Sequence, residues 1–154
     1  MSGPIILTLD SWAEQRLQAV LQSTSKQAFD VAFDAFISPL AQITLNGENV
    51  SRADYGTYLW KAQAHERSAT VDFKGVVAVP KDQDALIQTG EVGLFFVSNI
   101  NQPPLLFSEV VTASLNLIVD QPTDQPAGVD KRSVASLTQV STERPSNVKP
   151  LPGQ

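Results

Sequence analysis

The chain has 154 residues, enough for one domain with a sizeable hydrophobic core. Its hydrophobic share of 42% and charged share of 18% are ordinary for a folded domain, and its formal net charge is -5. This acidic balance and the scattered placement of the eleven basic residues argue against nucleic acid or an anionic membrane as the main partner. The absence of cysteine excludes disulfides, thiolate nucleophiles and cysteine-ligated metal sites.

The first apolar run, residues 4–9, is short and has no basic residue before it, unlike a secretory signal peptide. No segment approaches the roughly 20 apolar residues that a membrane-spanning helix needs. We therefore expect a cytoplasmic protein with no membrane partner.

Two helices are predicted first. Asp10 or Ser11 can cap the first one, because Ser11 and Glu14 have the spacing of a capping box. The second helix carries Phe29 and Phe33 four residues apart, and therefore on the same face.

Pro39 prevents this helix from continuing. The alternation of residues 41–45 predicts a half-buried strand that ends at an Asn46-Gly47 turn. Ser51 and Asp54 then indicate the start of a third helix.

Four longer strands are predicted at 68–80, 90–101, 105–120 and 132–143. In the first of them, simple alternation assigns Asp72 and Lys74 to one face. It assigns Val71, Phe73, Val77 and Val79 to the other. We expect one domain over residues 8–144 and a disordered, proline-rich tail over 145–154.

Helices followed by an antiparallel meander indicate an α+β domain. The order helix, helix, short strand, helix and four strands resembles the nuclear transport factor 2-like superfamily, which includes SnoaL-like cyclases, scytalone dehydratase and ketosteroid isomerase. Residues 33–47 resemble its helix-to-strand passage, and residues 134–140 resemble its closing strand. The resemblance implies N-terminal helices packed in a strongly curved, mainly antiparallel sheet, which forms a cone with an internal cavity.

Enzymes of this superfamily place ionisable residues inside the cone. Here the weak candidates are His65 or Asp72 as a base and Tyr55 or Tyr58 as a hydrogen-bond donor. His65 lies beside Glu66 and Arg67, where a helix-end histidine is the simpler interpretation. Asp72 is expected to face solvent, like Asp30, Asp34, Glu91 and Glu109, because charged residues are rarely buried without a partner.

Aromatic residues can line a hydrophobic ligand pocket, although core packing explains each of them individually. Trp60 is expected to be a partly covered helix residue, with an exposed position near a dimer surface as the alternative. No phosphate-binding loop and no pair of histidines for a metal are present, so no cofactor or metal is predicted. The predicted pocket residues are Phe29, Phe33, Tyr55, Tyr58, Phe73 and Phe96.

Three functions remain open. The first is a homodimeric binding module that holds a small apolar molecule. The second is a cofactor-free dehydratase, isomerase or cyclase acting on a polyketide-like or steroid-like carbonyl compound. The third is a structural or protein-interaction protein whose own side chains fill the cavity. The lack of a paired histidine and carboxylate favours the first and third.

The strand at 90–101 is apolar on both faces, with Leu94 and Phe96 on one and Phe95 and Val97 on the other. Because one cone can bury only one face, we expect a homodimer through the other. One continuous core is predicted from Phe29, Phe33, Val71, Phe73, Leu94, Phe96 and Val111.

Overall fold

The computed structural model describes residues 5–61, 68–101, 108–123 and 129–145. The described residues form three helices and six strands, in the predicted order apart from one additional short strand. The helices are α1 (Leu9–Leu21), α2 (Lys26–Phe36) and α3 (Arg52–Lys61), and the strands are β1 (Ile37–Leu45), β2 (Glu48–Val50), β3 (Ser68–Pro80), β4 (Gly90–Asn101), β5 (Ser108–Asp120) and β6 (Ser133–Pro145).

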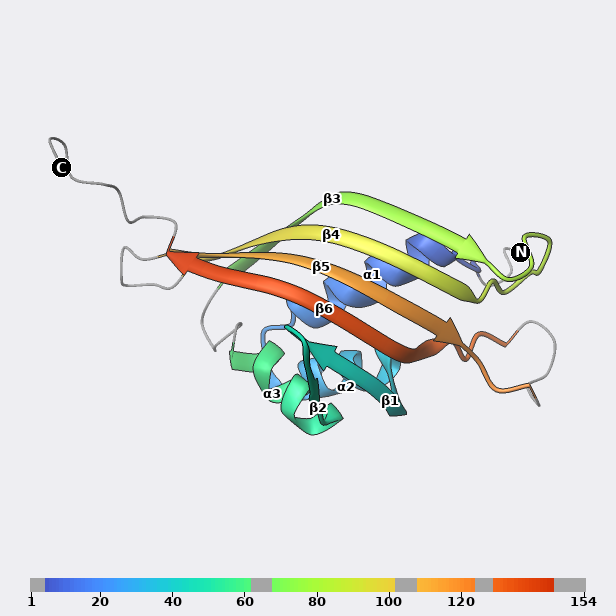
Figure 1. The fold of residues 1–154 in the computed structure, drawn as a ribbon, viewed down its shortest axis with the longest axis horizontal. Coiled ribbons are helices and arrows are strands. Elements are labelled where there is room, and N and C mark those ends of the chain that lie inside the picture. The colour runs from blue at the N-terminus through green and yellow to red at the C-terminus, as the bar shows by residue number, and fades with distance from the viewer. Residues whose placement is uncertain (1–4, 62–67, 102–107, 124–128, 146–154) are drawn as a thin grey trace, which may run out of the picture.

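All six strands form one sheet in the order β2-β1-β6-β5-β4-β3. The only parallel pair among the described strands is β1 with β6, so the sheet is mixed but mainly antiparallel. Figure 1 shows the long strands β3 to β6 as one curved layer with α1 running across it, while β1, β2, α2 and α3 gather beyond β6. The predicted α+β architecture is confirmed.

The starts of α1 and α3 differ in whether the predicted capping residue is the observed one. Ser51 caps α3 as predicted, because its Oγ accepts a hydrogen bond of 3.0 Å from the Asp54 N–H. The predicted cap at Asp10 or Ser11 is wrong: α1 begins at Leu9, and Thr8 is its N-cap residue. Leu9 is fully buried, so core packing draws the chain into the helix before the polar residues are reached.

The passage from α2 to β1 is direct, since the helix ends at Phe36 and the strand begins at Ile37. This agrees with the prediction that Pro39 prevents the helix from continuing. Asn46 and Gly47 both have positive φ, 51° and 86°, which is typical of a tight hairpin turn. The turn makes possible the short strand β2, which was not predicted.

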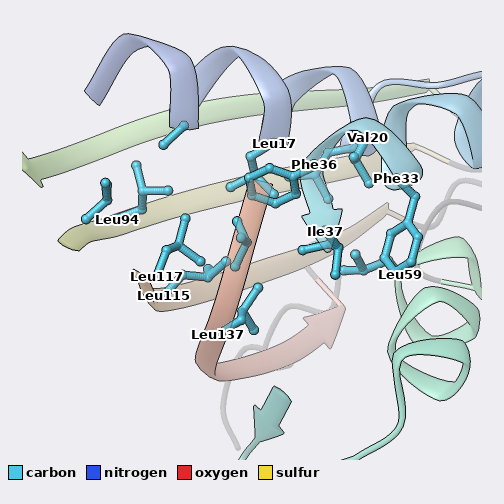
Figure 2. Close-up of a cluster of buried hydrophobic side chains, with 14 of the residues drawn as sticks. Leu17, Val20, Phe33, Phe36, Ile37, Leu59, Leu94, Leu115, Leu117 and Leu137 are labelled. Atoms are coloured by element: carbon cyan, nitrogen blue, oxygen red, sulfur yellow. The ribbon is translucent and has the colours of Figure 1, made fainter. Parts of the chain in front are cut away.

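The core lies between the helices and the inner face of the sheet, meaning the face that α1 covers. Figure 2 shows Leu94, Leu115 and Leu117 on the strands in the same cluster as Leu17 of α1. Of the seven predicted core residues, Phe29, Phe33, Leu94 and Phe96 belong to this cluster, and Val71 and Phe73 pack against it partly buried. Val111 is buried without belonging to the cluster.

Candidate functional site

The outer face of the sheet, meaning the face of β3–β6 opposite α1, carries exposed apolar side chains. Phe96 points inward and is 2% exposed, whereas its neighbour Phe95 points outward and is 44% exposed. Among the described residues, nine large hydrophobic side chains are exposed, and five of them lie on this face. They are Val77, Val79, Phe95, Ile118 and Val140.

A β-bulge puts two of these residues on the outer face. Phe73 pairs with Phe96 but Gly75 pairs with Phe95, so the register shifts by one residue between Phe73 and Gly75. One extra residue reverses the alternation beyond it. The prediction that Val77 shares a face with Phe73 is therefore wrong, and Val79 is displaced in the same way.

A groove of about 690 Å³ runs along this outer face. Its apolar lining includes Val77, Val79, Phe95 and Ile118, and the single charged residue in its lining is Glu91. Gly93 contributes no side chain to the groove beside Phe95, and Asn116, which also lines the groove, has its Oδ1 3.4 Å from the position of an added Cβ at Gly93. The groove is therefore suited to apolar side chains rather than to an ionic ligand.

Two ion pairs border the outer face, one in the middle of the edge strand β3 and one past its end. Lys74 Nζ is 2.5 Å from Asp72 Oδ2. Lys81 Nζ is 3.7 Å from Asp120 Oδ1, beyond the end of β3. Each pair compensates its own charge, so Glu91 is the one net charge in the groove lining despite the acidic composition of the chain.

Five of the six predicted pocket residues pack in two aromatic groups. The ring centroids of Phe29 and Phe33 are 5.7 Å apart, and those of Phe33 and Tyr55 are 6.2 Å apart. Phe73 and Phe96 form a separate edge-on pair at 6.2 Å. None of these five residues lines the outer groove.

Trp60 packs on this interior group, with its ring 5.3 Å from that of Phe29, and is partly buried as predicted. Gly56 of α3 faces the ring of Phe33 in α2, and a Cβ added at Gly56 would lie 3.4 Å from that ring.

The two tyrosines link α3 to β6. Tyr55 is fully buried, and its hydroxyl donates a hydrogen bond of 2.5 Å to Gln139 Oε1. Burial, together with the nearby Tyr58, raises the pKa of Tyr55 above its ordinary value. Tyr58 shares a hydrogen bond of 2.8 Å with Ser141. The two hydroxyl groups hold α3 against β6. The raised pKa keeps the Tyr55 hydroxyl protonated.

The ionisable candidates do not meet at one site in the described residues. Asp72 is exposed beside Lys74, which confirms its predicted solvated position. Asp30 and Asp34 are exposed partners of Lys26 and Arg52. Glu91 is also exposed. His65 lies outside the described residues, as does the Glu109 side chain.

Arg132 is a buried polar residue that sequence reasoning missed. Its side chain is fully buried, and its guanidinium donates to Asp130 Oδ2 at 2.7 Å, to Leu7 O at 3.0 Å and to Gln88 O at 3.1 Å. It also lies 5.5 Å from the ring centroid of Trp12. Arg132 thereby ties the N-terminal segment and two loops together at one end of the core.

Within the described residues, no group of three or more potential metal ligands is present. The same part of the chain contains no helix long and apolar enough to cross a membrane.

The sequence matches no protein-family model and no curated protein. Its fold does match solved structures. A conserved protein from Planctomyces limnophilus has a TM-score of 0.59 at 6% identity, with 87% of this chain and 94% of that chain covered. Candida albicans Mtr2 has a TM-score of 0.57 at 10% identity, with 88% and 95% covered.

A third match is to the complex of Candida albicans Mtr2 with the Mex67 M domain, at a TM-score of 0.56 and 10% identity over 89% of this chain and 96% of that chain. The chain has the nuclear transport factor 2-like fold. At these identities the likeness establishes the fold and no activity.

Proposed function

We propose that this nuclear transport factor 2-like domain is a non-catalytic interaction module that forms a homodimer through its outer sheet face. The observation that carries the proposal is the cluster of exposed apolar side chains around the groove, at Val77, Val79, Phe95 and Ile118. Monomeric proteins rarely expose large contiguous apolar patches, and such patches mark interaction sites.

The solved relatives support an interaction role for this fold. Mtr2 of Candida albicans, whose fold this chain shares, was solved in complex with the Mex67 M domain. That pairing belongs to Mtr2. It shows that the same architecture can present a protein interface, and we carry only that general capacity over to this chain.

Sedimentation velocity tests the proposal. We expect the wild type to be a dimer at micromolar concentration and Phe95→Glu to be a monomer, because the new carboxylate would be desolvated in the interface. Val31→Glu is the matched control, since Val31 is 67% exposed on α2 and away from the outer face. A monomeric wild type, or dissociation caused equally by both substitutions, would refute the proposal.

The small apolar ligand stays a prediction. The aromatic residues expected to hold it make close contacts with one another, so a ligand among Phe29, Phe33 and Tyr55 would have to separate rings already 5.7–6.2 Å apart. Titration with apolar fluorophores tests this. Saturable binding that is lost in Phe33→Ala and retained in Phe95→Ala would support an interior ligand site.

The enzymatic alternative also stays a prediction, and the interaction module implies that His65 is dispensable. We expect His65→Ala to leave dimerisation and any cellular activity intact. Screening carbonyl-containing polyketide-like and steroid-like compounds tests the alternative directly. Turnover by the wild type that disappears in His65→Ala would establish a histidine-dependent enzyme.

A further inference from the structure

The strand register makes the outer face complementary to itself, and this inference rests on the proposed function. Two rows of outward-facing residues cross β3, β4, β5 and β6 side by side. The first row is Gly75, Phe95, Ser114 and Val140, and the second is Val77, Gly93, Asn116 and Thr138. Small and large side chains alternate along the first row, and the second row has large residues where the first has small ones.

We propose that a second copy of this chain binds with a two-fold axis crossing β4 at Leu94, so that Phe95 of each copy enters the hollow over Gly93 of the other. When a two-fold axis lies in the plane between two facing sheets, it exchanges the residues that precede and follow the point where the axis crosses a strand. Residues i and i+2 of one strand, about 7 Å apart, then lie opposite each other across the interface. The same operation places Val77 opposite Gly75.

The remaining pairs fit the same axis. Ser114 lies opposite Asn116, which matches two polar side chains that can hydrogen-bond to each other. Val140 lies opposite Thr138, which brings the valine side chain against the threonine methyl group. The bulge at Gly75 is essential to this pattern, because without it Val77 would point inward and β3 would offer a different set of side chains.

Charge favours a second copy as the occupant. The chain carries a formal net charge of -5, so two copies repel one another unless their contact surface is neutral. All eight residues of the two rows are uncharged. The Asp72–Lys74 pair borders the first row on β3, the Lys81–Asp120 pair lies past the end of β3, and each compensates its own charge. Glu91, beside the second row, is the one charged residue in the groove lining.

The area available is adequate for a stable dimer. Four strands about 4.8 Å apart and eight residues of about 3.4 Å each give a projected footprint of roughly 500 Å², before the relief of the side chains is added. One partner in a stable interface contributes about 600–1,000 Å² of accessible surface. The flat projection is therefore slightly below that range, and the relief of exposed side chains such as Phe95, Val77 and Val140 adds to it.

A paired-variant experiment tests the axis. Phe95→Ala removes the side chain that enters the hollow, and Gly93→Val fills the hollow. Each variant alone therefore damages both symmetry-related contacts of its homodimer. We expect each to dimerise about 30-fold or more weakly than the wild type, as for loss of an interface hot spot. In the monomer, a Cβ added at Gly93 would lie 3.4 Å from Asn116 Oδ1, which is the end of a flexible side chain that can move aside.

Mixing the two variants restores one native contact, formed by Phe95 of the Gly93→Val chain and Gly93 of the Phe95→Ala chain. The other contact places an alanine against the filled hollow. We expect the mixed dimer, measured by native mass spectrometry, to be at least about tenfold tighter than the geometric mean of the two variant homodimers, beyond simple additivity. Gly93→Ala provides a milder version if Gly93→Val folds poorly, and circular dichroism of each monomer checks the fold.

The outcomes separate this inference from the proposed function. A monomeric wild type refutes both. A dimeric wild type that is dissociated by Phe95→Glu, together with a mixture no tighter than the geometric mean, leaves the homodimer in place and refutes the axis at Leu94.

Discussion

The two faces of the long strands differ in what covers them. On the inner face, Leu94 and Phe96 are buried beneath the helices, while on the outer face Gly93 and Phe95 border an open groove. The same short stretch of β4, residues 93–96, supplies side chains to both faces. A strand that is apolar on both sides needs a layer on each side, and the described part of the chain provides one of them, from its helices.

The largest expected effect contrasts two adjacent aromatic residues. Phe96→Ala should lower the free energy of unfolding by about 3–5 kcal/mol, because it opens a cavity in a packed core. Phe95→Ala should change monomer stability by less than about 1 kcal/mol, since Phe95 is substantially exposed there. Urea unfolding at a protein concentration below the dimer dissociation constant measures both.

The ratio of the two losses is the informative quantity. Equal losses in dilute monomer would mean that Phe95 is as much a core residue as Phe96, and the distinction between the faces would fail.

The sequence predicts much of this architecture. The four long strands lie close to their predicted bounds, and the Ser51 cap and the Asn46-Gly47 turn are observed. These features depend on local chemistry and on hydrophobic periodicity, which a sequence displays directly. The homodimer, the interior ligand and a role for His65 stay predictions.

The outer face could be anticipated only in part. Its presence follows from the apolar residues on both sides of β4, but the contribution of β3 depends on the bulge. Gly75 within a strand was the available signal, because glycine in a strand interior often marks a bulge. Arg132 gave no such signal, since its partners Leu7 and Gln88 are distant in sequence and meet it only in the folded chain.

The second prediction concerns the polar contacts that close the core. Arg132→Met should lower the free energy of unfolding by about 2–4 kcal/mol, because it leaves two backbone carbonyl groups without their donor and leaves the Asp130 carboxylate with only the backbone N–H of residue 132. Lys74→Met is the matched control on the outer face, where an exposed ion pair contributes about 0–1 kcal/mol. Similar losses for the two variants would contradict the contrast between buried and exposed charges.

The third prediction concerns the tyrosines that join α3 to β6. Tyr55→Phe should cost about 1–3 kcal/mol, because it leaves Gln139 Oε1 buried without its donor. Tyr58→Phe should cost less, since Tyr58 is only partly buried and water can reach its partner Ser141 more easily. Thermal unfolding of both variants measures the difference, and the reverse order would show that Tyr58 is the principal link.

The smallest expected effect is the acid dependence contributed by Asp130. Burial acts to raise the pKa of Asp130, but hydrogen bonds from the side chain and backbone of Arg132, aided by its charge, outweigh burial and lower this pKa below its ordinary value. A pKa lower in the folded than in the unfolded chain means that the unfolded chain binds the proton first as the pH falls. The stabilisation is therefore present above the unfolded pKa, near pH 4, and is lost as the pH falls through the folded pKa.

Asp130→Asn should therefore lose less stability than the wild type when urea unfolding is compared at about pH 5 and about pH 2.5. Some acid dependence should remain, because a hydrogen bond from Thr8 lowers the pKa of Asp10 as well. In an Arg132→Met background, Asp130→Asn should change the acid dependence less, since the guanidinium is gone and only the backbone N–H of residue 132 still donates to the carboxylate. An unchanged acid dependence in the single variant would show that the carboxylate of Asp130 is not what Arg132 stabilises, and would assign the role of Arg132 to its two carbonyl contacts and to Trp12.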